Sequence, residues 1–299
     1  MRVAVSLAGL CAGLFLSQAA LAADPLPQRW VSAGGSLSEW VVALGGESKL
    51  VGVDTTSLNP ASLKALPSIG YQRQLAAEGI LSLRPDMLLG TEEMGPPPVI
   101  EQVKAAGVRI ELLPSRAELP VLEKNLTLIG GLLGDEARAQ KVFANYSQRF
   151  EQQAKWVAET QRTQKAPRVL LLLGHAGSNP MAAGKDTAAA WIIERAGGQN
   201  ITDHLGYKAI SNEALAALDP DVVVFADRRL EGEEAKAALL KQNPALAMTR
   251  AGKQGRLLPL DPTLLVGGLG PRLPDGVAAL SAGFYPQAPA LTANSQNQP

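Results

Sequence analysis

Short apolar runs alternate with amphipathic stretches along most of the chain, and this alternation predicts a series of strands and helices. The apolar runs have the length and composition of strands buried on both faces, and they cover residues 29–33, 50–53, 87–90, 108–113, 168–174, 222–226 and 256–260. Amphipathic stretches at 37–44, 99–106 and 187–196 are each followed by glycine and predict helices. We expect Ser36 to cap the first of them. Strands that alternate with helices indicate parallel sheets covered on both faces.

One sequence motif occurs twice and divides the chain into two similar halves. Glu78-Gly-Ile-Leu-Ser-Leu-Arg-Pro-Asp86 and Glu213-Ala-Leu-Ala-Ala-Leu-Asp-Pro-Asp221 share a glutamate, an apolar residue, a leucine and a final Pro-Asp at a separation of 135 residues. Each copy predicts a short amphipathic helix that proline ends, followed by a buried strand. The chain is therefore expected to form two α/β lobes, and a cleft between lobes is a common place for a small ligand.

A long uninterrupted helix is predicted between the two halves. Residues 135–164 contain no proline or glycine and are rich in good helix formers, which predicts a rigid helix about 45 Å long. Such a helix should limit the relative motion of the lobes. The predicted fold class is α/β, with two doubly wound parallel-sheet lobes joined by a long backbone helix and a ligand cleft between them. The expected boundaries are 1–22 signal peptide, 23–134 N-terminal lobe, 135–165 connecting helix, 166–287 C-terminal lobe and 288–299 loose tail.

The start of the chain predicts export. Arg2, an apolar stretch at 3–16 and Ala20-Leu21-Ala22 match the three regions of a cleaved signal peptide over residues 1–22. The alternative is a membrane anchor, but Ser17-Gln18 breaks the apolar stretch before the ~20 residues that span a bilayer. Cys11 is the single cysteine and lies in this segment, so the mature chain should have no disulfide and no cysteine nucleophile. We therefore expect the mature protein to lie in the bacterial periplasm.

Composition and motifs exclude several classes of function. The chain has 28 basic and 28 acidic side chains, which gives no electrostatic footprint for nucleic acid or for a membrane surface. With 46% hydrophobic and 19% charged residues it can bury a sizeable core. The sequence lacks a Gly-x-Ser-x-Gly elbow, a Walker loop and a metal-hydrolase helix, so we do not expect an enzyme. A zinc or manganese carrier would usually bring three histidines, whereas this chain has His175 and His204 only.

Three strings carry a resemblance to a known family. They are Gly70-Tyr71-Gln72-Arg73, the segment Gly-His-Ala-Gly-Ser-Asn-Pro-Met-Ala-Ala-Gly at 174–184, and the less specific Gly-Pro-Arg-Leu-Pro-Asp at 270–275. With the two lobes, the long helix and the paired glutamates, the chain resembles the substrate-binding proteins of bacterial ABC importers for cobalamin, siderophores and haem, in particular the periplasmic haem-binding branch. The resemblance implies a monomer that captures haem and delivers it to a permease dimer in the inner membrane. A siderophore or cobalamin binder of the same fold is the alternative.

Tyr71 is the expected iron ligand. A phenolate suits ferric iron, and tyrosine is an established axial ligand of haem. Phenols ordinarily titrate near pH ~10, so a phenolate needs a favourable neighbour. Arg73 lies two residues further and can favour the charged form by a hydrogen bond and by its charge. The alternative is a half-buried loop tyrosine beside a solvated arginine.

Residues after two strands of the second half are candidates for support of the haem. His175 follows a predicted strand directly and is interpreted either as a second iron ligand, on the same or a second haem, or as a packed histidine. Arg228 and Arg229 follow the strand at 222–226, where a guanidinium can reach Tyr71 or a haem propionate. Arg228 is preferred as the inward member, and a solvated pair is the alternative. His204 is expected to be an ordinary loop residue.

Glu78 and Glu213 occupy equivalent positions in the two copies of the repeat. The resemblance implies that they dock into arginine pockets on the two permease subunits. The alternative is stabilisation of the helix dipole, since an acid in the first turn contributes about 0.3–1 kcal/mol.

Overall fold

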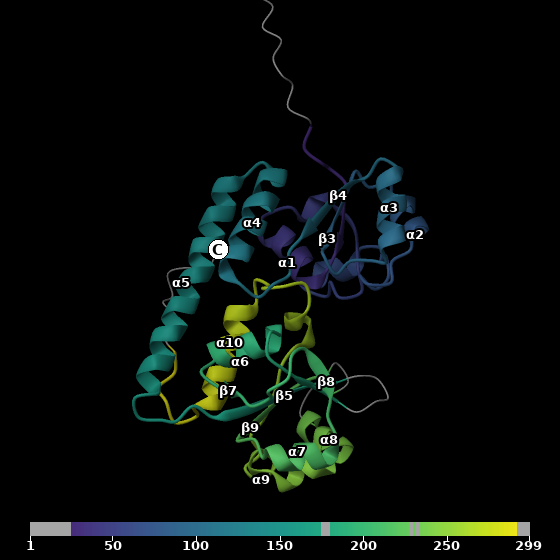
Figure 1. Cartoon of the computed structure of the whole chain (residues 1–299). Coiled ribbons are helices and arrows are strands. Elements are labelled where there is room, and N and C mark those ends of the chain that lie inside the picture. Colours follow the sequence, from purple (N-terminus) through teal and green to yellow (C-terminus); the bar gives the residue numbers. More distant parts are fainter. Residues whose placement is uncertain (1–24, 175–179, 228–229, 231–233, 292–299) are drawn as a thin grey trace, which may run out of the picture.

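The computed structural model describes residues 25–174, 180–227, 230 and 234–291. Two α/β lobes lie one above the other in Figure 1, and the long helix α5 (Glu136–Thr160) runs beside both. The two-lobed α/β fold predicted from the repeat is confirmed. The predicted signal peptide, His175, Arg228 and Arg229 lie outside the described residues.

The N-terminal lobe is built on a parallel sheet of four strands in the order β2-β1-β3-β4. Its elements are β1 (Trp30–Ala33), α1 (Gly35–Ala43), η1 (Glu47–Lys49), β2 (Leu50–Val53), η2 (Ala61–Ala65), α2 (Ala77–Ser82), β3 (Met87–Thr91), α3 (Pro97–Ala105), β4 (Arg109–Leu113) and α4 (Leu119–Leu133). Side chains alternate across the strands, so Leu88 packs with Ile80 of α2 and Ile100 of α3. Leu89 faces the opposite core, with Leu126 of α4. Helices therefore cover both faces, as the continuous apolar strands predict.

The C-terminal lobe has a six-stranded sheet in the order β10-β9-β5-β6-β8, with β7 paired to β5. Its elements are β5 (Arg168–Leu173), β6 (Met181–Ala183), α6 (Ala188–Arg195), β7 (Gln199–Asn200), β8 (Tyr207–Ala209), α7 (Asn212–Leu218), β9 (Val222–Ala226), α8 (Ala235–Gln242), η3 (Pro244–Met248), α9 (Arg250–Lys253), β10 (Leu257–Pro259), η4 (Pro262–Leu265) and α10 (Leu273–Phe284). The central strands β5, β9 and β10 are parallel, as predicted. The strands β6 and β8 are antiparallel, which the sequence analysis did not predict. The connection from β5 to β6 is too short for the crossover helix that a parallel strand needs.

The connecting helix α5 is shorter than predicted and has a partner that the sequence analysis missed. It begins where the Asp135 carboxylate accepts a hydrogen bond from the backbone amide of Arg138 at 2.9 Å, and it ends at Thr160 rather than Gln164. Helix α4 lies beside α5 in Figure 1. A Cβ atom added at Gly130 would lie only 2.6 Å from the Cβ atom of Ala139, so a larger residue at position 130 would separate the two helices. The two glycines within α4 serve this close contact and conceal the helix in the sequence.

Aromatic side chains on α5 join the cores of the two lobes. Tyr146 makes an edge-to-face contact with Trp40 of α1 and another with Phe150, with ring centroids 5.3 Å and 5.1 Å apart. Phe150 makes the same kind of contact, at 5.2 Å, with Trp191 of α6 in the C-terminal lobe. Such pairs contribute about 0.5–1.5 kcal/mol each beyond the burial of their area. A single hydrophobic core therefore extends through both lobes.

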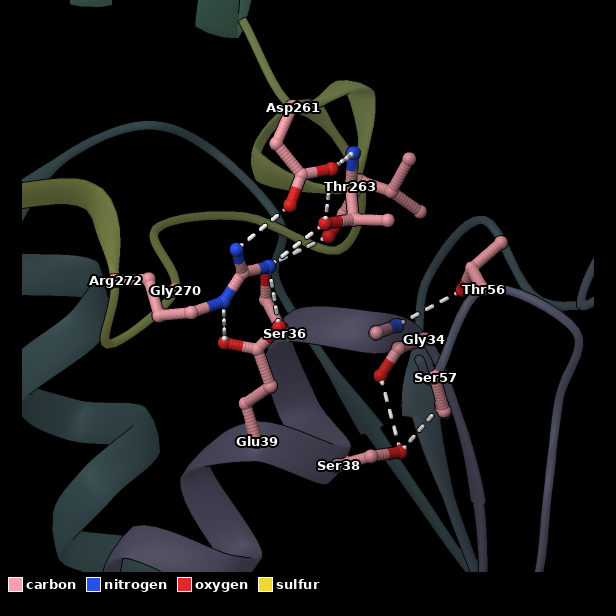
Figure 2. A network of polar contacts seen from close by, with 12 residues as sticks. Gly34, Ser36, Ser38, Glu39, Thr56, Ser57, Asp261, Thr263, Gly270 and Arg272 are labelled. Carbon is pink, nitrogen blue, oxygen red and sulfur yellow. Dashed lines mark hydrogen bonds and ion pairs between the residues drawn. The ribbon is translucent and has the colours of Figure 1, made fainter. Parts of the chain in front are cut away.

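Residues 261–272 form a second connection, because they leave the C-terminal lobe and lie against α1 (Figure 2). The Trp40 indole N–H donates to the Leu269 carbonyl oxygen at 2.7 Å, and the Ser36 hydroxyl donates to the Val266 carbonyl oxygen at 2.7 Å. The expected capping role of Ser36 is wrong: the N-cap of α1 is Gly34, without a side-chain hydrogen bond. The hydroxyl of Ser36 instead binds the returning segment.

Arg272 ties this segment to α1 through a half-buried ion-pair network (Figure 2). Its guanidinium forms a two-pronged pair with the Glu39 carboxylate, at 2.9 Å and 2.7 Å, and a further pair with Asp261 at 2.7 Å. Burial lowers the pKa of Arg272, but hydrogen bonds and charges from Glu39 and Asp261 outweigh burial and raise it. The Glu39 side chain is only 6% exposed, so its charge depends on this arginine.

We predict that Arg272→Met lowers the free energy of unfolding by about 3 kcal/mol, because it leaves the buried Glu39 carboxylate without a cation. The double variant Glu39→Gln with Arg272→Met should lose less, since no charge is then left unpaired. Urea unfolding measures both. Arg162→Met is the control, because the Arg162–Glu159 pair is 72% exposed on each side, and it should leave the midpoint unchanged. A double variant less stable than Arg272→Met alone would contradict the prediction.

Candidate functional site

The carboxyl ends of strands from both sheets meet at the boundary between the lobes. Residues that follow β1 and β4 are contacted there by two glycines of the returning segment. A Cβ atom added at Gly267 would lie 3.5 Å from the backbone nitrogen of Ser36. One added at Gly268 would lie 3.3 Å from the carbonyl oxygen of Ser115. Both glycines have a positive φ, 83° and 86°. Ligands of open α/β sheets bind beyond the carboxyl ends of the strands, so this boundary is the candidate site.

A buried polar network around Asp54 fixes the loops at the N-terminal side of the boundary, and Figure 2 shows its members Gly34, Thr56 and Ser57. The Asp54 side chain follows β2 and is 2% exposed. Its carboxylate accepts hydrogen bonds from the backbone amide of Gly34 at 3.0 Å, the backbone amide of Thr56 at 3.1 Å and the hydroxyl of Ser57 at 2.8 Å. The Thr56 hydroxyl in turn accepts from the backbone amide of Gly35 at 2.9 Å. The loops after β1 and β2 are thereby held as a rigid platform.

Tyr71 lies at this edge with an open side chain. The chain before it runs beside β2, where Ser68 forms a parallel bridge with Val53, and then turns at Gly70, which has a φ of 87°. The backbone amide of Thr55 donates to the Gly70 carbonyl oxygen at 2.9 Å and fixes the turn. Tyr71 remains 41% exposed, which is unusual for a large aromatic side chain in this chain. An exposed phenol on a fixed loop is accessible to a ligand.

Arg73 is paired with a glutamate that the sequence analysis did not single out. Its Nη2 donates to the Oε2 of Glu93 at 2.5 Å, and the two side chains are 52% and 39% exposed. The hydrogen bond with Glu93 raises the pKa of Arg73, and the charge of Tyr71 contributes less in the same direction. The guanidinium is therefore within electrostatic reach of Tyr71 but bonded to Glu93. Glu93 follows β3 at the same sheet edge, and this placement was the signal available in the sequence.

A second tyrosine, Tyr207, belongs to β8 of the C-terminal lobe. Burial raises the pKa of Tyr207, hydrogen bonds with the Ala189 backbone and the Thr187 side chain act against burial, and the charge of Glu93 adds to the rise. Since Glu93 belongs to the N-terminal lobe, Tyr207 lies within electrostatic reach of the Arg73–Glu93 pair. Its hydroxyl is held at the start of α6, unlike the open phenol of Tyr71.

The chain carried a signal for Tyr207 that the sequence analysis overlooked. A Gly-Tyr pair precedes each copy of the repeat: Gly70-Tyr71 comes before Glu78 and Gly206-Tyr207 before Glu213, with the second pair one residue closer to its glutamate. Gly206 has a φ of 67°, so both tyrosines follow a glycine in the left-handed region. The two Gly-Tyr pairs thus resemble each other in backbone conformation, although they are one residue out of register with the repeat.

Glu78 and Glu213 lie in the first turns of α2 and α7, and both are exposed. The Ser211 hydroxyl caps α7 by accepting from the Ala214 backbone amide at 3.3 Å. A hydrogen bond with its own backbone amide, followed by one with Ser211, lowers the pKa of Glu213. The first-turn positions that the repeat predicts are thus observed, and they suit both interpretations of these residues.

Among the residues that the structure describes, the remaining candidates do not form a second site of this kind. The ring of His204 packs against Gly184, and a Cβ atom added at Gly184 would lie only 2.4 Å from its Nδ1. This is the contact of a packed loop residue. A hollow of about 730 Å³ lies at the other end of the C-terminal sheet. Arg168, the first residue of β5, and Arg256, which directly precedes β10, are among the residues that line it. Among the described residues, no group of three histidine, cysteine or acidic side chains is arranged to hold a metal ion. Within the same ranges, no helix has the length and apolarity needed to cross a membrane.

Comparison with known proteins places this architecture among binding proteins. A periplasmic haem-binding protein from Pseudomonas aeruginosa is 64% identical in sequence, with a TM-score of 0.87 over 90% of this chain and 96% of that one. An uncharacterised ABC transporter substrate-binding lipoprotein from Bacillus subtilis is 27% identical over 265 residues, 87% of this chain and 81% of that protein. A vitamin B12-binding protein from Pectobacterium atrosepticum is 24% identical over 217 residues, 71% of this chain and 75% of that protein.

The match to a family model extends across both lobes and through the connecting helix α5. It covers residues 31–264, from the first strand of the N-terminal lobe to the segment that returns towards α1, and the model describes periplasmic binding proteins. The chain therefore belongs to the periplasmic binding protein family.

Proposed function

We propose that this protein binds ferric haem at the boundary between its lobes and delivers it to an ABC permease. The observation that carries the proposal is the open Tyr71 at the facing sheet edges of a chain that is 64% identical to a haem-binding protein. Export through a cleaved signal peptide at 1–22 and action as a monomer in the periplasm are part of the proposal. The protein holds and releases its ligand, and we propose no catalytic step.

Tyr71 supplies the axial oxygen to the haem iron in this proposal. Ferric iron is a hard acid, and it stabilises the phenolate of a bound tyrosine. The positive charge of Arg73, already within reach of Tyr71, favours the same charged form. Glu93 shares Arg73 in the structure and so sets how much of that charge acts on the phenolate.

The C-terminal lobe provides the opposite wall. Leu205 is 65% exposed and directly precedes Gly206 and Tyr207, so it offers apolar surface to the flat porphyrin. His175 and Arg228 support the bound haem in this proposal, Arg228 by pairing with a propionate or with Tyr71. An arginine suits this task because its planar fork binds a carboxylate through two hydrogen bonds.

Glu78 and Glu213 dock the protein onto the two subunits of the permease in this proposal. They are exposed, they lie one on each lobe, and they occupy equivalent helix turns. Exposed ion pairs contribute only about 0–1 kcal/mol each, so their role is to orient the complex more than to strengthen it.

The ligand assignment predicts that Tyr71→Phe abolishes the high-spin Fe(III)–phenolate absorption of the haem complex. Affinity should fall at least about tenfold, which corresponds to 1.4 kcal/mol, because the coordinate bond is lost while the ring remains. Tyr207→Phe is the matched control, since its hydroxyl is already bonded within its own lobe, and its spectrum should match that of the wild type. Retention of the wild-type spectrum in Tyr71→Phe would sink the assignment.

The shared core predicts that the lobes move little on loading. Small-angle scattering profiles of the protein with and without hemin should nearly superimpose, because closure would break the contacts of Trp40, Tyr146 and Phe150 across the lobes. A clear fall in the radius of gyration on addition of hemin would show that these contacts do not restrain the lobes.

The docking proposal predicts that the double variant Glu78→Ala with Glu213→Ala binds hemin as the wild type does but supports less uptake. Uptake is measured in vesicles that carry the reconstituted permease, and binding by absorption titration. The pair Glu101→Ala with Glu194→Ala serves as the control, since it removes two charges from α3 and α6 instead. Weaker hemin binding would place Glu78 and Glu213 in the ligand site, and unimpaired uptake would leave them only a helix-dipole role.

A further inference from the structure

In each lobe, an arginine next to a central strand binds the far end of the helix that carries the exposed glutamate. In the N-terminal lobe, Arg29 stands just before β1. Its Nε donates to the carbonyl oxygen of Arg84 at 3.0 Å, and its Nη2 donates to the carbonyl oxygen of Leu83 at 2.7 Å. These carbonyls belong to the C-terminal end of α2, where backbone acceptors have no partner within the helix.

The C-terminal lobe repeats this arrangement. Arg168 begins β5, and its Nη1 donates to the carbonyl oxygen of Asp219 at 2.9 Å, while its Nη2 donates to that of Leu218 at 2.9 Å. Leu218 is the last residue of α7 and Asp219 is its C-cap, whereas Leu83 is the C-cap of α2 and Arg84 follows it. A guanidinium thus binds the two equivalent carbonyls in both lobes, through Nε and Nη2 in Arg29 and through Nη1 and Nη2 in Arg168.

Each arginine, together with the two carbonyl groups that it binds, is called a clamp below. The aspartate of the repeated Pro-Asp adds a further hydrogen bond to each clamp. Asp86 accepts from the backbone amide of Arg29 at 2.9 Å, and Asp221 accepts from that of Arg168 at 2.9 Å. The residues before the two prolines, Arg84 and Asp219, have positive φ values of 47° and 40°. A non-glycine residue is strained in this region, so the surrounding hydrogen bonds must hold it there.

We propose that Arg29 and Arg168 are positioning residues for permease docking, each fixing the helix that presents Glu78 or Glu213. The inference rests on the proposed docking role of the glutamates and adds the groups on which that role depends. The arginines bind the C-terminal ends of the helices, whereas the glutamates lie in the first turns.

The helices need such an anchor because they are short. Helix α2 has six residues and α7 has seven, well below the length at which an isolated helix is stable. Each buries one side chain in the core, Ile80 in α2 and Leu215 in α7. Leu81 in α2 and Leu218 in α7 pack against the same cores but are only partly buried, so the clamp at the C-terminal end adds a polar restraint on rotation about the helix axis.

The two clamps are not equally strong. In the C-terminal lobe, Arg250 also pairs with Asp219 at 2.9 Å and with Asp221 at 2.7 Å. The N-cap of α7 is Ser211, with a side-chain hydrogen bond, whereas the N-cap of α2 is Ala76, without one. Helix α2 therefore depends more on Arg29 than α7 depends on Arg168.

The test uses Arg29→Lys and Arg168→Lys in the full mature protein. Lysine keeps the charge at the helix end but lacks the fork that binds two carbonyls at once. Arg162→Lys, in an exposed pair at the end of α5, is the matched control. Arg29→Lys should speed amide hydrogen exchange in residues 79–83 about tenfold, Arg168→Lys should have a smaller effect in 214–218, and hemin titrations of both should match the wild type.

Uptake into vesicles with the permease then shows whether the arginines act through the glutamates. Arg29→Lys should reduce uptake, and it should add no further loss in a protein that already carries Glu78→Ala, because the presented group is gone. Losses that multiply in the double variant, or unchanged exchange in α2, would overturn the proposal. Failure of the wild type to bind hemin would instead overturn the proposed function, and the exchange data would still report on the clamp.

Discussion

The contact of aromatic side chains from α5 with both lobes is the interaction on which the rest of the structure depends. Trp40, Tyr146, Phe150 and Trp191 join the two cores edge to face, and the Arg272–Glu39 pair fastens the returning segment to α1. Because these contacts keep the carboxyl ends of the two sheets at the boundary between the lobes, the groups there are arranged before a ligand arrives. A preformed site avoids most of the ordering cost of binding.

The two lobes are similar in construction and different in chemistry. Both keep the short helix, the Pro-Asp and the arginine that binds the helix end. They differ at the tyrosine that follows the left-handed glycine. Tyr207 is bonded at the start of α6 and resists ionisation, whereas Tyr71 is open and lies near a cation. A duplicated frame thus offers one phenol for coordination, and it keeps two outer helices in matching positions.

Local signals in the sequence were sufficient for most of the fold. Apolar runs predicted the parallel strands, and the repeat predicted both lobes, because each of these features is written within a few neighbouring residues. Two of the errors concern contacts between distant residues. Helix α4 contains Gly130 because α5 approaches closely there, and Ser36 binds the carbonyl oxygen of Val266 instead of capping its helix.

The site divides in the same way. The loop position of Tyr71 and the first-turn glutamates follow from motifs. The pairing of Arg73 with Glu93 depends on how the loops after β2 and β3 fold, and the influence of Glu93 on Tyr207 depends on how the two lobes are placed. No pattern within a single segment specifies these arrangements. The strand-end rule and the repeated Gly-Tyr were nevertheless present in the sequence, and applied to every strand they would have singled out Glu93 and Tyr207 as well.

An absorption titration of the wild-type protein with hemin, alongside parallel titrations with cobalamin and a ferric siderophore, tests the central proposal most directly. If haem is the ligand, hemin should saturate the protein and give the bands of a high-spin ferric haem with an oxygen ligand, and neither of the other compounds should compete with it. A hemin spectrum that stays that of free hemin, together with saturable binding of cobalamin or the siderophore, would contradict the proposal.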